Sequence, residues 1–185
     1  MKEPDSPLTN AQVQELLHLA LRTYHDQAAM CHKAKAYLAS CIMAGAVVEA
    51  VLTATINYLY PEALKTGKAP KYNRGPRKGE IKDLLEWSLN DLLIVAKKSK
   101  WLPENVILEP QLDLRKVKAP VSTDSIRKLR NLVHPVRYLQ DMPGKEYTEE
   151  KLNILYATCH AVYTHVQDVL VKDIQKSHPS YKPLW

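Results

Sequence analysis

The sequence predicts an all-α protein, a bundle of about five helices with one long irregular connection. Two observations lead to this fold class. Only five of the 185 residues are glycine, and long stretches contain neither glycine nor proline, whereas an all-β chain needs frequent turns. Apolar residues recur at helical spacing within those stretches. Length and the 45% hydrophobic content suit a single domain, which we expect over residues 1–176 with a tail at 177–185.

The N-terminal sixty residues predict two antiparallel helices. No proline and only one glycine lie between Pro7 and Pro61, a stretch too long for one helix of a globular protein. Thr9 or Asn10 can cap the start of the first helix. Its core-facing residues recur at helical spacing and are Val13, Leu16, Leu17, Ala20, Leu21 and Tyr24. A polar patch follows, so we expect the chain to turn near residues 32–35.

The second helix is expected to run from about Tyr37 to Tyr60 and to stop at the proline that follows. Its residues 40–59 are about as long as a membrane-spanning segment. Glu49 lies in the middle of that stretch, and a carboxylate at the centre of a bilayer costs about 2.5–3.5 kcal/mol on insertion scales. A helix buried on most sides inside a bundle explains the segment better, so we expect no membrane partner.

Cysteine usage, the N-terminus and the net charge indicate the setting of the protein. Cys31, Cys41 and Cys159 are odd in number and lie in apolar helical stretches, so we expect reduced core thiols. No apolar run follows a basic region at the N-terminus, as it does in a secretory signal, and we expect a cytoplasmic location. The formal charge of +6 favours polyanionic partners without identifying one.

A basic loop separates the second helix from the third. Residues 65–79 hold three glycines, two prolines and six basic residues without one acid. A charge run of this kind is more often a solvated excursion than a phosphate-contacting arm. If it is an arm, the candidate RNA or phosphate ligands are Lys71, Arg74, Arg77 and Lys78.

Two further segments follow the basic loop. Helical spacing predicts a third helix over residues 80–98, whose core residues are Ile81, Leu84, Leu85, Leu92, Leu93 and Ala96. Three prolines within residues 101–123 predict an ordered but irregular connection. It is longer than connections in helical bundles usually are, which suggests a role in packing or in shaping a site.

Two helices complete the predicted fold. Ser122, Thr123 or Asp124 can cap a short helix that ends near His134, because the next residue is a proline that disfavours continuation. Thr148 can cap the last helix, which has acidic residues in its first turn. Its core stripe is Leu152, Leu155, Cys159, Val162, Val166 and Leu170.

The short helix before the last one carries the strongest functional signal. At about 100° per residue, Arg127 projects within about 20° of His134, and Arg130 within about 40°. Asn131 lies within about 60° of the same direction. One side of this helix therefore offers two guanidiniums, an amide and an imidazole.

These residue types suit phosphate chemistry on RNA. An arginine fork can hold a phosphodiester and oppose the charge that develops during in-line attack. His134 suits a general acid for the leaving oxygen, since the end of a helix favours the charged imidazole, and Asn131 can orient phosphate or ribose. Attack by the ribose 2′-hydroxyl needs no metal. The histidines and cysteines show no zinc-site spacing, so we expect neither a metal nor a cofactor.

The same pattern has a purely structural interpretation. Arginine and asparagine near a proline-terminated helix end often bond to unpaired carbonyls, and a histidine before proline can act as a cap. From the pattern alone this interpretation is the commoner one. A family resemblance favours the functional interpretation.

The sequence RNLVHP at residues 130–135 resembles the hallmark of the HEPN superfamily of helical domains, many of which are ribonucleases. Residues 44–52 resemble the long second helix of such proteins, with Glu49 among small and apolar residues. Residues 92–103 resemble the segment that often precedes the motif. The likeness extends over about residues 10–170 and implies a HEPN-like helical bundle.

The resemblance implies a metal-independent endoribonuclease in a toxin–antitoxin or antiviral defence setting, with a neutralising partner protein. Its catalytic residues would be His134, Arg130, Arg127 and Asn131. Family members place four to six residues between the arginine and the histidine. Arg127 has six and Arg130 has three, so two assignments of the functional arginine stay open. The alternatives are a non-catalytic module that binds RNA, a nucleotide or a protein, and a purely structural dimer subunit.

Active family members pair so that two motif helices line one cleft, which implies a homodimer. Glu49 is then expected to support the cluster, either as a partner of Arg127 or Arg130 or by relieving the crowding of like charges at the interface. Arg137 and Tyr138 follow the motif directly. They are candidates for contacting a phosphate and stacking on a base, or else are turn and core residues.

Overall fold

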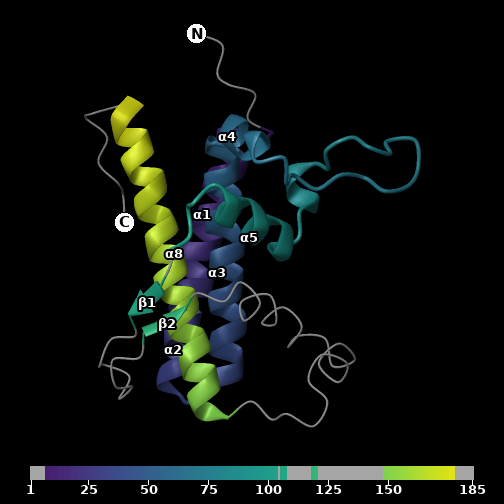
Figure 1. Cartoon of the computed structure of the whole chain (residues 1–185). Helices are drawn as coiled ribbons and strands as arrows, with labels where there is room; N and C mark the ends of the chain where they lie inside the picture. Colours follow the sequence, from purple (N-terminus) through teal and green to yellow (C-terminus); the bar gives the residue numbers. More distant parts are fainter. Residues whose placement is uncertain (1–6, 104, 108–117, 121–147, 178–185) are drawn as a thin grey trace.

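The computed structural model describes residues 7–103, 105–107, 118–120 and 148–177 (Figure 1). Most of these residues are helical, which confirms the all-α class for the described part of the chain. The elements in chain order are α1 (Asn10–His18), a π-helical turn (Leu19–Tyr24), α2 (His25–Lys33), α3 (Tyr37–Tyr58), α4 (Tyr60–Lys65), a 3₁₀ turn (Leu84–Glu86), α5 (Leu89–Lys98), β1 (Asn105–Ile107), β2 (Lys118–Pro120) and α8 (Glu149–Ser177).

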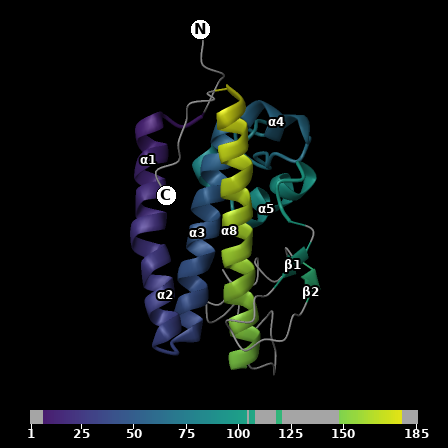
Figure 2. The same ribbon diagram turned by 90° about the vertical axis from the view of Figure 1, so that its left-hand side faces the viewer.

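Three long helical rods form the body of the described part of the chain. Helices α1 and α2 continue one another through the π-helical turn, and α3 packs between this rod and α8 (Figure 2). Because α3 has neighbours on both sides, most of its residues are buried. It is the only described helix long and apolar enough to cross a membrane, and 72% of its most apolar window is buried within the bundle.

The start of the first helix and the turn after α2 lie where the sequence predicts them. Thr9 and Gln12 form a capping box: Thr9 Oγ1 accepts from the Gln12 amide at 3.3 Å, and Gln12 Oε1 accepts from the Thr9 amide at 2.9 Å. Helix α2 ends at Lys33, and Lys35 takes a positive φ of 59° in the turn before α3. The predicted break near residues 32–35 is confirmed.

The end of α3 differs from the prediction. The helix stops at Tyr58 rather than at Pro61, and a short new helix, α4, begins at Tyr60. Pro61 lies in the first turn of α4, where a proline is tolerated because its missing N–H would have no intrahelical partner. The proline therefore starts a helix here and does not end one.

Helix α8 follows its prediction closely. The Lys151 amide donates to Thr148 Oγ1 at 3.4 Å, so Thr148 caps the helix. All six residues of the predicted stripe are buried against the rest of the bundle, and Cys159, Val162 and Val166 are fully inaccessible. The helix runs to Ser177, which is the first residue of the predicted tail. The rest of that tail lies outside the described residues.

The predicted helix over residues 80–98 is wrong in its first half. The only helical element within residues 80–88 is a 3₁₀ turn, and α5 begins after Ser88, whose hydroxyl accepts from the Asp91 amide in a second capping box. Leu85, a predicted core residue, is 65% exposed, whereas Leu84 is buried. Ile81 belongs to the paired segment of the loop and Leu84 to the 3₁₀ turn, so their helical spacing does not come from a helix that continues into α5.

The connection after α5 is more regular than predicted. Strands β1 and β2 pair antiparallel, with Asn105 opposite Pro120 and Ile107 opposite Lys118. The ladder lies beside the lower half of α8 (Figure 1). The short helix predicted to end near His134 lies outside the described residues.

Candidate functional site

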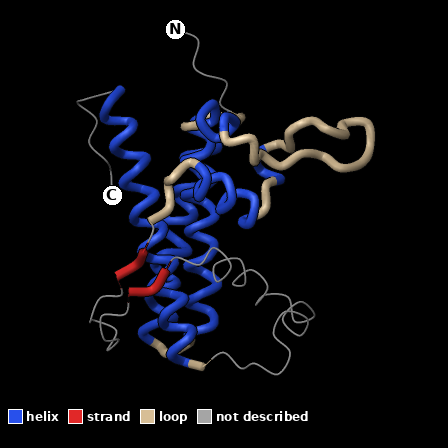
Figure 3. Tube along the Cα trace, in the orientation of Figure 1, coloured by secondary structure: helices blue, strands red, loops and turns tan. Residues whose placement is uncertain are grey.

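The predicted site residues divide into two groups. Arg127, Arg130, Asn131, His134, Arg137 and Tyr138 lie outside the described residues. The structure describes Glu49, predicted to support the motif, and the four basic residues of the loop at 65–79. Glu49 is on the middle of α3, and the loop projects from the bundle (Figure 3).

Glu49 borders a pocket of about 260 Å³ between the π-helical turn, α3 and the 3₁₀ turn. The lining residues are Leu16, Leu19, Ala20, Tyr24, Ala46, Glu49, Ala50, Thr53, Leu84, Leu85 and Trp87. Three alanines among them leave the hollow open because their side chains are short. The Glu49 side chain is half-buried, a position in which a carboxylate needs a cationic or hydrogen-bonding partner.

The walls of this pocket are mostly apolar. Trp87 is buried, and its indole N–H donates to the Lys82 carbonyl at 3.0 Å, so it presents only its ring. Leu19 and Leu85 are 44% and 65% exposed. The pocket is smaller than most small-molecule sites, which are about 300–1,000 Å³. The pocket therefore has one carboxylate, that of Glu49, within a mostly apolar lining.

The basic loop is a paired hairpin that projects from the bundle (Figure 3). The Tyr72 amide donates to the Glu80 carbonyl and the Gly79 amide to the Tyr72 carbonyl, both at 2.9 Å, and the Lys82 amide donates to the Pro70 carbonyl at 2.9 Å. Gly79 has a φ of +91°, a conformation that side chains with a Cβ rarely adopt. We call residues 68–82 the basic hairpin.

Arg77 is the centre of an interaction network at the base of this hairpin. Its guanidinium donates to both carboxylate oxygens of Asp83, at 2.9 and 3.1 Å, and to Glu80 Oε2 at 3.0 Å. It also lies over the Tyr72 ring, 4.4 Å from the centroid, and the Tyr72 hydroxyl donates to Glu86 Oε2 at 2.7 Å. The carboxylates raise the pKa of Arg77, and the guanidinium lowers the pKa of Asp83.

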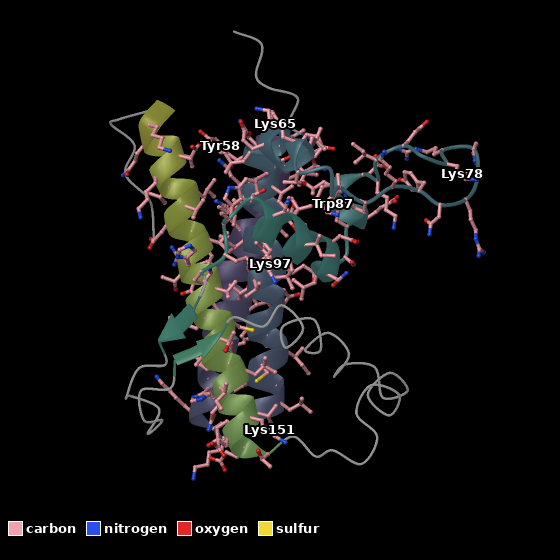
Figure 4. The ribbon with its side chains drawn as sticks, viewed as in Figure 1. Tyr58, Lys65, Lys78, Trp87, Lys97 and Lys151 are labelled. Atoms are coloured by element: carbon pink, nitrogen blue, oxygen red, sulfur yellow. The ribbon has the colours of Figure 1, made fainter. Side chains whose placement is uncertain are left out.

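The other predicted phosphate ligands differ from Arg77. Lys71, Arg74 and Lys78 are exposed, and within the described part of the chain none of them forms an ion pair. Lys78 lies at the far end of the hairpin, well away from Trp87 and the bundle (Figure 4). The sequence grouped four cations as equivalent. All four are exposed, and the structure separates them by their interactions, because of the four only Arg77 forms ion pairs within the described residues.

Sequence reasoning missed a histidine–tyrosine cluster between α2 and α8. His25 Nε2 lies 3.1 Å from the Tyr163 hydroxyl, and His32 Nε2 lies 3.1 Å from Asn153 Oδ1. His32 also stacks on Tyr156 with ring centroids 4.4 Å apart. These pairs are more than 120 residues apart in sequence, so no local spacing could reveal them. Within the described residues no three His, Cys, Asp or Glu side chains gather to hold a metal ion.

Comparisons of the chain with protein-family models, with curated proteins and with solved structures found no match.

Proposed function

We propose that this chain is a HEPN-like, cytoplasmic homodimer that cleaves RNA as a metal-independent endoribonuclease. The observation that carries the proposal is the sequence of residues 124–138, whose helical spacing predicts one shared face for Arg127, Arg130, Asn131 and His134. Residues 130–134 of this stretch read RNLVH. The described helices support it, since a helical bundle with Glu49 at the middle of its central helix is the scaffold that the resemblance implies.

The reaction follows from the chemistry of these groups. The ribose 2′-hydroxyl attacks the adjacent phosphorus, the P–O5′ bond breaks, and the products are a 2′,3′-cyclic phosphate and a 5′-hydroxyl. His134 donates the proton to the leaving 5′ oxygen. Arg127 or Arg130 stabilises the charge on the non-bridging oxygens. In a homodimer, the imidazole of the second protomer is the candidate acceptor of the 2′-hydroxyl proton.

The test is cleavage of a panel of single-stranded and structured RNAs in excess chelator. Wild-type protein is compared with His134→Ala, and with His18→Ala as a matched control because His18 is exposed at the end of α1. We expect cleavage with cyclic-phosphate ends in the wild type and the control, and a loss of at least a hundredfold in His134→Ala. Cleavage that persists in His134→Ala, with circular dichroism confirming folded proteins, rules the mechanism out.

Single substitutions then separate the two arginines. Arg127→Lys and Arg130→Lys keep the charge but lose the bidentate fork. We expect the variant that replaces the phosphate-contacting arginine to lose RNA cleavage, and the other variant to keep most of its activity.

Induced expression in a bacterial host tests the proposed toxin or defence setting. Growth arrest that requires His134 supports this setting.

A second function is favoured by one specific observation, the three-residue spacing between Arg130 and His134. If Arg130 with Asn131 is the motif arginine, this spacing is shorter than the four to six residues of catalytic members. The chain is then a non-catalytic module that binds RNA, a nucleotide or a protein partner. Retained RNA binding without cleavage, in a dimer confirmed by light scattering, assigns this function instead.

A further inference from the structure

Nearly all of the net charge of the chain resides in the basic hairpin. Residues 68–82 hold six lysines and arginines and one glutamate, a formal charge of +5 out of +6 for all 185 residues. The remainder of the chain is almost neutral. Positive charge gathered on one projecting element attracts polyanions to that element.

The acidic residues near this hairpin do not neutralise its tip. Glu80 and Asp83 both engage Arg77, and Glu86 accepts the Tyr72 hydroxyl. These interactions lie at the base of the hairpin, where it joins the 3₁₀ turn. Arg74 and Lys78 lie nearer the tip and Lys71 lies in the paired segment, and all three side chains are exposed to solvent.

Backbone pairing and the Arg77 network give the hairpin a defined conformation before any ligand binds. The paired segments at 70–72 and 79–82 are closed by a turn in which the Lys78 amide donates to the Gly75 carbonyl at 3.2 Å. Gly75 has a φ of +79°, which the turn requires and glycine adopts without strain. A preformed element loses less conformational entropy on binding than a flexible loop does.

The chemistry of the tip favours a nucleic acid backbone over other polyanions. Residues 73–78 contain no leucine, isoleucine or aromatic side chain. An anionic membrane surface is usually bound with such residues inserted beside the basic ones, and a protein interface usually has an apolar core. Phosphate contacts by lysine and arginine need neither.

We infer that the basic hairpin is a preassembled arm that binds the phosphate backbone of RNA through Lys71, Arg74 and Lys78, while Arg77 holds the arm in shape and makes no contact with RNA. The choice of RNA among nucleic acids rests on the proposed function. The arm adds affinity without sequence preference, since phosphate contacts position a nucleic acid and do not read its bases.

The experiment measures RNA binding in the full-length His134→Ala protein, which leaves the RNA uncut. A fluorescent single-stranded RNA is titrated at several salt concentrations. The test variant adds Lys71→Gln, Arg74→Gln and Lys78→Gln. A matched control removes the same charge from the end of α5 and the turn after it, where three lysines are also exposed, by changing Lys97, Lys98 and Lys100 to glutamine.

We expect the hairpin variant to bind at least tenfold more weakly at low salt. The slope of log K against log salt should fall by about 2, since each phosphate contact on a single strand contributes about 0.7. The α5 control should change the slope by less than half of that. Equal effects of the two triple variants would show that only net charge matters and would overturn the inference.

Arg77→Gln tests the division of roles within the hairpin. We expect faster amide hydrogen exchange at Tyr72 and Gly79, whose amides close the hairpin, because the variant loses the contacts to Asp83 and Glu80. A lower salt slope with unchanged exchange at these amides would instead make Arg77 a phosphate ligand and overturn this part of the inference.

Two comparisons keep this inference separate from the proposed function. Hairpin-dependent RNA binding by a protein that never cleaves RNA supports the arm and rejects the ribonuclease. Cleavage by the wild type together with hairpin-independent binding supports the ribonuclease and rejects the arm. Phosphatidylserine vesicles and polyglutamate serve as competing probes, and stronger hairpin-dependent binding to either of them than to RNA would reject RNA as the partner.

Discussion

Asn57 on α3 holds Leu8 in the segment before α1 through two hydrogen bonds. Its Oδ1 accepts from the Leu8 amide at 2.7 Å, and its Nδ2 donates to the Leu8 carbonyl at 3.4 Å. Both residues are buried, so neither backbone group can turn to water instead. This clamp joins the start of α1 to the far end of the antiparallel helix α3.

Substituting Asn57→Leu should lower the free energy of unfolding by about 1–3 kcal/mol. The change removes both hydrogen bonds and leaves the Leu8 amide buried without a partner. Urea denaturation measures the loss. Asn10→Ala is the control because Asn10 is exposed, and it should cost less than about 0.5 kcal/mol. Equal effects of the two substitutions would contradict the clamp.

Leu84 and Leu85 should respond very differently to truncation. Leu84→Ala removes a side chain that is 2% exposed and should cost about 2–5 kcal/mol. Leu85 is 65% exposed, so Leu85→Ala should cost less than about 0.5 kcal/mol. The same urea titration decides the comparison. A large loss in Leu85→Ala would support the continuous helix over residues 80–98 that the sequence predicts.

The three thiols should differ in their reaction with iodoacetamide at pH 8. Cys41 and Cys159 are fully buried, and burial raises the pKa of Cys41 to about 12 and also raises the pKa of Cys159, so few thiolates form there. Cys31 is only half-buried. Mass spectrometry of the native protein should show one early adduct on Cys31, and three adducts in urea. Early modification of Cys41 would contradict the packing of α3 against α8.

The Arg77–Asp83 pair predicts a low titration midpoint for one carboxylate. Arg77 lowers the pKa of Asp83 below the usual 3.8, because its guanidinium donates to the ionised carboxylate. The pair therefore stabilises the folded protein at pH values above the unfolded-state pKa of Asp83. This stabilisation is lost as the pH falls through the lower folded-state pKa. A carbon-detected NMR titration should place the midpoint below 3.8 in the wild type and nearer 3.8 in Arg77→Gln. An unchanged midpoint would contradict the pairing.

Local signals in the sequence were sufficient to predict several elements of the fold. The Thr9 capping box, the break before Tyr37 and the apolar stripe of α8 depend on residues within a few positions of one another. Helical hydrogen bonds and caps join such near neighbours, so the sequence predicts them without knowledge of the fold. The same reasoning predicted the face that Arg127 and His134 share, which lies outside the described residues.

Other features depend on contacts between distant segments. The periodicity of residues 80–88 suited a helix, yet the basic hairpin pairs residues 80–82 with its other strand, a 3₁₀ turn follows at residues 84–86, and α5 begins only after its cap at Ser88. Nothing in the charge run distinguished Arg77 from its neighbours, because that difference arises only when the hairpin brings Asp83 and Tyr72 to it. The sequence of this protein thus specifies its helices through short-range bonding. Which cation forms ion pairs, and which side chains line the pocket at Glu49, follow from packing, since a side chain's partners depend on where the folded chain places the others.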